Sequence, residues 1–112
     1  MKKSPESEFI GNHTLHAVGV ARAIKYYKSN GAAFCSQGDS SASEGYCFEA
    51  YNGASREQLP VLFVIQNNGY GISVPTSQQT ANPCVADNFA GIKHLHIERC
   101  DGTDVLDSWA AV

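Results

Sequence analysis

The sequence lacks the features that mark several common classes of protein. No apolar run in it approaches the roughly 20 residues that a membrane-spanning helix requires. Its basic residues form no cluster and the formal net charge is −3, which argues against a nucleic-acid partner and against a basic helix on a membrane surface. Internal repeats and low-complexity stretches are missing as well. The 112 residues therefore suit one ordinary domain.

Cysteine is present but occurs in none of the usual metal or redox patterns. Cys35, Cys47, Cys84 and Cys100 form no Cys-x-x-Cys pair and no zinc-ligand spacing. We expect free, mostly buried thiols in a reducing cytoplasm, with a redox or metal role as the alternative.

The N-terminal segment is polar and has no apolar signal-peptide core. Residues 1–8 are therefore expected to be a flexible leader or a cloning remnant, and residues 9–112 to form the domain. A cytoplasmic location follows as the expectation.

Hydrophobic periodicity predicts alternating helices and strands. Helices are expected over residues 12–29, 42–56 and 85–90 and from residue 104 onward, and strands over residues 32–36, 61–65 and 94–100. Asn12 or Thr14 is expected to cap the first helix, and Asn30-Gly31 to end it. Ser41 followed by Glu44 has the pattern of a capping box for the second helix.

The apolar run at residues 61–65 is the strongest strand signal. It does not alternate with polar residues, which predicts burial on both faces in a parallel sheet. The helix before it is expected to bury Cys47, Phe48 and Tyr51, and residues 67–83 are expected to form a long loop. The whole order indicates an α/β fold with a mostly parallel sheet and flanking helices, in which residues 32–66 form one right-handed crossover.

Two polar residues follow neighbouring predicted strands. Asp39 comes just after the first strand and Asn68 just after the second. Parallel neighbours place both at the carboxyl edge of the sheet, where open α/β folds bind ligands. A carboxylate, an amide oxygen and nearby backbone carbonyls are oxygen ligands of the kind that magnesium prefers.

The loop beside Asp39 adds an expected anion site. Gly38, Ser40 and Ser41 lead into the N-terminus of a predicted helix, where backbone N–H groups and the helix dipole attract phosphate groups. On spacing alone, ordinary turns at Asp39 and at residues 67–69 remain the simpler interpretation.

A family resemblance shifts that balance. Gly38-Asp39-Ser40 followed by Asn67-Asn68 resembles the fingerprint of thiamine diphosphate enzymes. The motifs around it resemble the alpha subunit of 2-oxo acid dehydrogenases over about residues 10 to 112; they are His16-Ala17-Val18-Gly19-Val20-Ala21, Ser43-Glu44-Gly45, Glu49-Ala50, Asn52, Asn67-Asn68-Gly69-Tyr70-Gly71-Ile72-Ser73-Val74-Pro75 and Gln79-Thr80.

The resemblance implies part of a three-layer thiamine diphosphate-binding fold and a set of site residues. The magnesium ligands fall on Asp39, Asn68 and the main-chain carbonyl of Tyr70. Cofactor contacts fall on Asn68, Tyr70 and the residues Gly38, Ser40, Ser41, Ile10 and Ile72. Within that set, Ser40 and Ser41 offer backbone to the diphosphate, and Ile10 matches a bulky apolar residue that supports the bent cofactor.

The sequence departs from the family pattern in two respects. Ser40 replaces the third glycine of the fingerprint, which strains the backbone only if that position needs a positive φ. The family's catalytic histidines, its upstream arginine and tyrosine contacts and the partner's activating glutamate have no counterpart, so no residue is assigned a catalytic role.

The resemblance implies oxidative decarboxylation of a 2-oxo acid, with a lean towards branched-chain substrates and pyruvate as the other option. The implied partners are a beta subunit or beta-like domain and a lipoyl-bearing acyltransferase, in a homo- or hetero-oligomer. Alternatives are another thiamine diphosphate enzyme (an acetoin dehydrogenase or a transketolase-like protein), a non-catalytic binding module, and a receiver-like domain, which is disfavoured because paired acidic residues after the first strand are missing.

Other chemistry-bearing residues give weaker signals. His13 with His16, and His94 with His96, have the spacing of metal pairs, but no cysteine or carboxylate is placed to complete a site. We interpret these histidines as solvated or helix-capping.

Overall fold

The computed structural model describes residues 10–112, and the expected leader at residues 1–8 lies outside them. The elements in chain order are α1 (His13–Tyr26), β1 (Ala33–Gly38), η1 (Ser41–Ser43), α2 (Gly45–Glu57), β2 (Val61–Gln66), β3 (Tyr70–Gly71), β4 (Val74–Pro75), η2 (Thr76–Gln78), η3 (Val85–Phe89) and α3 (Val105–Ala111), where η denotes a short 3-10 helix. The predicted order of helix, strand, helix and strand over the first 66 residues is confirmed.

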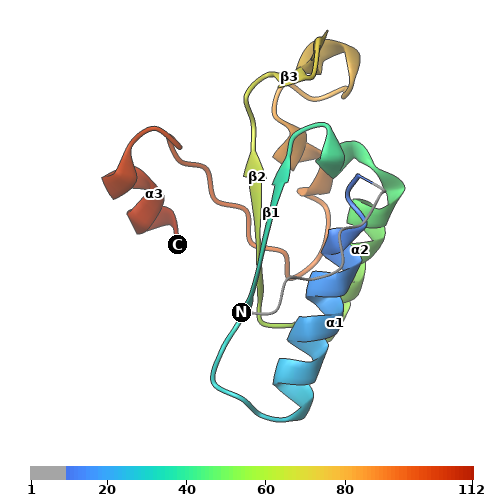
Figure 1. Ribbon diagram of the computed structural model, residues 1–112, viewed down its shortest axis with the longest axis vertical. Coiled ribbons are helices and arrows are strands. Elements are labelled where there is room, and N and C mark those ends of the chain that lie inside the picture. Colours follow the sequence, from blue (N-terminus) through green and yellow to red (C-terminus); the bar gives the residue numbers. More distant parts are fainter. Residues whose placement is uncertain (1–9) are drawn as a thin grey trace.

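The centre of the molecule is a parallel pair of strands. β1 and β2 run in register from Ala33 opposite Val61 to Gly38 opposite Gln66, and α2 is the crossover between them. Figure 1 shows α1 and α2 together on one side of the strand pair, with α3 on the other side. The predicted α/β class with a parallel sheet and flanking helices is confirmed at this level.

The core lies between α2 and the strands. Cys47, Tyr51 and Ala54 are buried because their spacing of four and three residues places them on one helix face. The Tyr51 ring meets Phe63 and Phe89 edge to face, with centroids 4.7 and 4.6 Å apart. The predicted burial of Phe48 is wrong: its position lies about 100° around the helix from Cys47, and it is 53% exposed.

Helix α1 ends earlier than predicted. It stops at Tyr26, and Lys28 takes the left-handed conformation, with φ +52°, that Gly31 was expected to supply. The Ser29 N–H donates to the Ile24 carbonyl at 3.0 Å, which is the hydrogen bond of a Schellman C-terminus. At the other end, Asn12 occupies the N-cap position as predicted, but its side chain makes no capping hydrogen bond.

The start of α2 also differs from the prediction. Ser41 begins the short helix η1, Glu44 has an extended backbone with ψ 145°, and α2 starts at Gly45. Neither side chain makes a capping hydrogen bond, so the capping box is wrong. The break at Glu44 is the reason, because Ser41 and Glu44 do not belong to one continuous helical turn.

The third predicted strand does not form. Leu95 and Ile97 are half-buried and pack against the core, as their alternation suggests, but His94 has φ +66° and the described sheet ends with β2. For the same reason β2 is only half-buried instead of covered on both faces. The predicted loop at residues 67–83 contains the β3–β4 hairpin and η2. The short helix near 85–90 and the last helix, capped by the Asp104 side chain, are confirmed.

The length and hydropathy of the described helices bear on whether any of them could span a membrane. None of those in residues 10–112 combines the length and the apolar character needed to cross a bilayer.

Candidate functional site

The carboxyl ends of β1 and β2 lie side by side because the last residues of the two strands, Gly38 and Gln66, are paired. Asp39 follows the first strand directly, and Asn68 follows the second by two residues. The predicted placement of both residues at one sheet edge is therefore confirmed. Their environments differ, because Asp39 is 4% exposed whereas Asn68 is exposed.

The Asp39 carboxylate connects its own loop to the loop after β2. Oδ1 accepts a hydrogen bond from the Ser40 N–H at 2.7 Å. Oδ2 accepts from the Gly69 N–H at 3.1 Å and from the Thr76 hydroxyl at 3.3 Å. Among the ion pairs of the described residues none involves Asp39. A buried carboxylate held only by N–H and O–H donors keeps its negative charge available to a cation.

The loop after β2 turns sharply at two asparagines. Asn67 Oδ1 accepts from the Gly69 N–H at 3.0 Å, and Asn68 Oδ1 accepts from the Tyr70 N–H at 2.9 Å. Gly69 has φ +81°, a conformation that favours glycine. These are the local turns that asparagine side chains commonly stabilise. Turn geometry and a ligand role are compatible here, because an amide oxygen has two lone pairs.

The β3–β4 hairpin follows this turn and projects from the carboxyl edge of the strands (Figure 1). Tyr70 pairs with Pro75 and Gly71 with Val74, which leaves Ile72 and Ser73 as the two-residue turn. Ile72 has φ +59° and its side chain is fully exposed. A β-branched residue in this backbone region is strained. The hairpin thus presents an apolar side chain at its tip, in a conformation that costs free energy.

Ser40 has an ordinary helical backbone, with φ −64°. The replacement of the fingerprint glycine therefore causes no strain, as the sequence analysis allowed. The Ser40 hydroxyl donates a hydrogen bond to the side-chain oxygen of Gln79. Thr76 and Gln79 were not predicted to contact this edge, although Gln79 belongs to one of the family-like motifs, since nothing in a short polar stretch indicates contacts with residues 37 and 39 positions earlier.

The remaining predicted residues surround this edge. Ser41 begins η1, and its carbonyl oxygen lies 3.0 Å from the Cys47 thiol. Gly11 packs close to that carbonyl, because a Cβ on Gly11 would lie 3.2 Å from it. The structure thereby places the neighbouring Ile10, which is 64% exposed, beside the Ser41 loop. Gly38 has no close neighbour that would exclude a Cβ.

Beneath the site lies a buried polar network. The Cys47 thiol lies 3.2 Å from Gln37 Oε1, and Gln37 Nε2 donates to the Tyr51 hydroxyl. Burial raises the pKa of Cys47, and it raises the pKa of Cys35 to about 11. Both thiols are therefore protonated at neutral pH, which makes them structural groups instead of nucleophiles.

The four cysteines are all free. Cys35 and Cys47 are buried, Cys84 is half-buried and Cys100 is exposed, so the expected burial holds for two of them. His13 Nε2 lies 2.9 Å from the Ser36 carbonyl oxygen, which links α1 to β1. Within residues 10–112 no group of three or more histidine, cysteine, aspartate or glutamate side chains is placed to hold a metal. A magnesium ion bound by residues 10–112 would therefore take amide or backbone oxygens in addition to a carboxylate.

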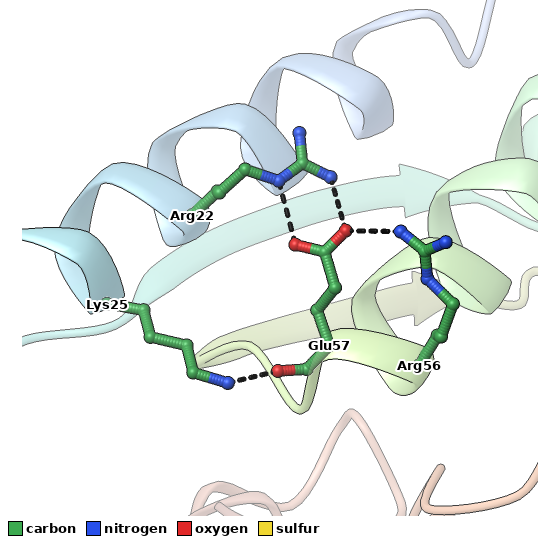
Figure 2. A network of polar contacts seen from close by, with 4 residues as sticks. All are labelled: Arg22, Lys25, Arg56 and Glu57. Atoms are coloured by element: carbon green, nitrogen blue, oxygen red, sulfur yellow. Dashed lines mark hydrogen bonds and ion pairs between the residues drawn. The ribbon is translucent and has the colours of Figure 1, made fainter.

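A second charged region joins α1 to the end of α2, the helix that precedes β2 (Figure 2). Glu57 accepts two hydrogen bonds from Arg22, at 2.8 and 2.9 Å, and one from Arg56 at 2.7 Å, while Lys25 donates to the Glu57 carbonyl. Arg22, followed by Arg56, lowers the pKa of Glu57 to about 2.

A shallow cavity of about 490 Å³ lies beside this network. Lys25 and Arg56 lie in the last turns of α1 and α2, where their charges complement the helix dipoles, and Lys25 also binds a backbone carbonyl. We therefore interpret the network as a set of ion pairs and hydrogen bonds that holds α1 against α2.

Comparison with known proteins identifies the family. Residues 2–112 match the family described as the dehydrogenase E1 component. The chain belongs to this family. It is 40% identical over 109 residues to the 3-methyl-2-oxobutanoate dehydrogenase subunit alpha of Mycobacterium tuberculosis, a match that covers 97% of this chain and 29% of the relative. It is 38% identical over 104 residues to the pyruvate dehydrogenase E1 component subunit alpha of Staphylococcus aureus, covering 91% of this chain and 27% of the relative.

Membership of the E1 family confirms the resemblance to alpha subunits and excludes the receiver-like alternative. The chain spans less than a third of the length of the curated relatives that it matches. The family implies thiamine diphosphate in the full enzyme. The donor types at the edge around Asp39 are compatible with a magnesium-bound diphosphate, because a buried carboxylate without a cationic partner in the described residues lies next to the loop that carries the Asn68 amide oxygen.

Proposed function

We propose that this chain carries the magnesium and diphosphate anchor of a thiamine diphosphate-dependent 2-oxo acid dehydrogenase. The observation that carries the proposal is the contact between Asp39 Oδ2 and the Gly69 N–H, at 3.1 Å. It joins the two loops that follow neighbouring parallel strands, and so brings the Asn68 loop to a buried carboxylate. Oxygen ligands from two such loops leave coordination positions for phosphate oxygens and water, as magnesium requires.

In this proposal Asp39, the Asn68 side chain and the Tyr70 main-chain carbonyl hold the metal ion. The backbone of Gly38, Ser40 and Ser41 faces the diphosphate. The Ser40 N–H now donates to Asp39 Oδ1 at 2.7 Å, so a phosphate oxygen at this amide competes with the carboxylate for one hydrogen. If Asp39 bound a metal ion, its carboxylate would accept this hydrogen bond less strongly, and the Ser40 N–H would be more available to a phosphate oxygen.

Two exposed isoleucines complete the proposed site. Ile72 stands at the hairpin tip and Ile10 beside the Ser41 loop, 101% and 64% exposed. Both offer apolar surface to the cofactor rings, whose burial would offset the cost of exposing them in the free protein. The proposed fold of the whole domain is the three-layer thiamine diphosphate-binding fold, of which the β1–β2 pair and its helices are a part.

Bound thiamine diphosphate supplies the chemistry that removes carbon dioxide from a 2-oxo acid. This chain binds and orients the cofactor, and the acyl group passes to a lipoyl-bearing partner protein. A beta subunit or beta-like domain completes the site. We propose that this chain alone has no turnover, because it holds no assigned acid–base residue; decarboxylation by the chain alone would overturn that statement.

The test is a calorimetric titration of the full-length protein with thiamine diphosphate and Mg²⁺. We expect Mg²⁺-dependent binding that Asp39→Ala abolishes. Absence of binding by the wild type, or unchanged binding by Asp39→Ala, would favour a non-catalytic interaction module instead.

The proposed substrate is a branched-chain 2-oxo acid, in line with the name of the M. tuberculosis relative. The assembled enzyme should then have a higher kcat/KM for 3-methyl-2-oxobutanoate than for pyruvate. A preference for pyruvate would support the substrate class of the S. aureus relative, and turnover of acetoin or a sugar ketone would support a different thiamine diphosphate enzyme.

A further inference from the structure

Two segments carry the proposed site: residues 38–41, which begin with the last residue of β1, and the hairpin at residues 70–75. Asp39 is one connection between them, and Gln79 is a second. The half-buried Gln79 side chain accepts a hydrogen bond from the Ser40 hydroxyl and donates from Nε2 to the Val74 carbonyl at 2.5 Å. One carboxamide therefore contacts both segments at the same time.

The packing around Gly71 shows how closely these segments approach. A Cβ built on Gly71 would lie 1.9 Å from the Ser40 Oγ and 2.9 Å from both terminal atoms of the Gln79 side chain. No side chain fits there without displacing the Ser40 hydroxyl or the Gln79 carboxamide. The hairpin backbone thus rests directly on the Ser40–Gln79 pair.

We infer that Ser40 and Gln79 form a latch that holds the hairpin in place, and that Gln79 is a positioning residue for the cofactor. This inference rests on the proposed function. The hairpin carries the Tyr70 carbonyl and Ile72, while residues 38–41 carry Asp39 and the diphosphate-facing backbone. A ligand that contacts both segments binds more tightly when they are already in place, because less conformational entropy is lost on binding.

The latch depends on the residue that departs from the family fingerprint. Glycine at position 40 has no hydroxyl, so the hydrogen bond to Gln79 Oε1 exists only because this chain has serine. The replacement therefore adds a connection within the site, in addition to leaving the backbone unstrained.

The first experiment tests the latch without cofactor. Hydrogen exchange is measured in the full-length apoprotein for the wild type, Ser40→Ala, Gln79→Met and the double variant. We expect faster exchange in peptides covering residues 69–76 in each single variant, and no increase in the double variant beyond that of Gln79→Met, which loses the contacts with both Ser40 and Val74. Gln78→Met is the matched control, because Gln78 is an exposed glutamine one position away. Unchanged exchange in Ser40→Ala and Gln79→Met would overturn the latch.

The second experiment tests positioning. The Kd for thiamine diphosphate at saturating Mg²⁺ should rise about fivefold in Ser40→Ala, as expected for the loss of one neutral hydrogen bond. It should rise at least as much in Gln79→Met, which also loses the hydrogen bond to the Val74 carbonyl. The double variant should show about the same rise as Gln79→Met, since the Ser40–Gln79 contact is already lost in that variant. Gln78→Met should bind like the wild type. A lower thermal midpoint with an unchanged Kd would overturn the positioning role and leave Gln79 as a purely structural residue.

The two proposals fail in different ways. If the wild type does not bind thiamine diphosphate, the proposed function fails and the positioning role fails with it, whatever the exchange data show. If the wild type binds and Asp39→Ala does not, while Ser40→Ala and Gln79→Met bind normally, only the inference about Gln79 is overturned.

Discussion

The two ends of the β1–β2 pair hold carboxylates in opposite situations. At the carboxyl end, Asp39 is 4% exposed and is held by N–H and O–H groups alone. At the amino end, Glu57 lies at the surface and is paired with Arg22 and Arg56. The second arrangement is electrostatically complete, whereas the first still offers a buried negative charge. We therefore propose that the cofactor binds at the edge with the incompletely compensated carboxylate, and we interpret the more conspicuous charge cluster as structural.

Removing the negative charge at the carboxyl end should give the largest effect on cofactor binding, and removing it at the amino end is the matched comparison. Asp39→Asn should weaken Mg²⁺-dependent binding of thiamine diphosphate by about 100-fold or more, because a charged ligand is lost from a buried site. Glu57→Gln, the matched change at the other end, should leave the Kd unchanged and lower the thermal midpoint. Titration calorimetry and calorimetric unfolding of the same preparations measure both. Weaker cofactor binding in Glu57→Gln would break the functional distinction between the two ends.

Gly71→Ala should sharpen the comparison by disturbing only the functional end. The added methyl group has to displace the Ser40 hydroxyl, which lies 1.9 Å from the ideal Cβ position. We expect a loss of about 2 kcal/mol in unfolding free energy, from overpacking and the broken hydrogen bond. The control is Gly53→Ala in α2, where a Cβ meets nothing within 4 Å. It should stabilise the protein by about 0.5–1 kcal/mol in denaturant titrations. Equal effects of the two variants would contradict the close packing at Gly71.

Replacing Ile72 should separate stability from binding. Its φ of +59° strains a β-branched residue, so Ile72→Asn should raise the unfolding free energy by about 1 kcal/mol. The same variant should bind thiamine diphosphate less tightly, because the apolar contact at the hairpin tip is lost. Denaturant titration and calorimetry of one preparation test both statements. A variant that is more stable and binds equally well would remove Ile72 from the proposed site.

The smallest expected effect is the loss of fold stability when acid protonates Glu57 at the amino end, because its ion pairs are at the surface. The pKa of Glu57 in the folded protein is about 2, below its ordinary value of 4.5. Its pairing therefore stabilises the fold fully above pH 4.5, and this contribution is lost as the pH falls from 4.5 towards 2. The thermal midpoint of Glu57→Gln should show a shallower decline over this interval than that of the wild type. Parallel declines would show that the network does not contribute.

The parts of the fold that were predicted correctly are those in which the local hydrophobic pattern also fixes how the strands pair. The alternation of helices and strands placed Asp39 and Asn68 at one edge, because strands that follow a helical crossover run parallel. Prediction from sequence failed at residues 94–100, where a real alternation of Leu95 and Ile97 serves packing against the core instead of strand pairing. It also failed at Ser41 and Glu44, because a capping-box pattern says nothing about a backbone break between the two residues.

By itself the sequence determined the family, the parallel strand–helix–strand unit and the residue types at its carboxyl edge, since these follow from local hydrophobic pattern and motif. Only the tertiary structure decided that the Asp39 carboxylate reaches Gly69 and Thr76, and that Ser40 reaches Gln79 across 39 residues. Such contacts depend on how two loops fold back over one sheet edge. Glycine φ values, close backbone approach and the reach of short side chains fix that path, and none of them is encoded in residue spacing.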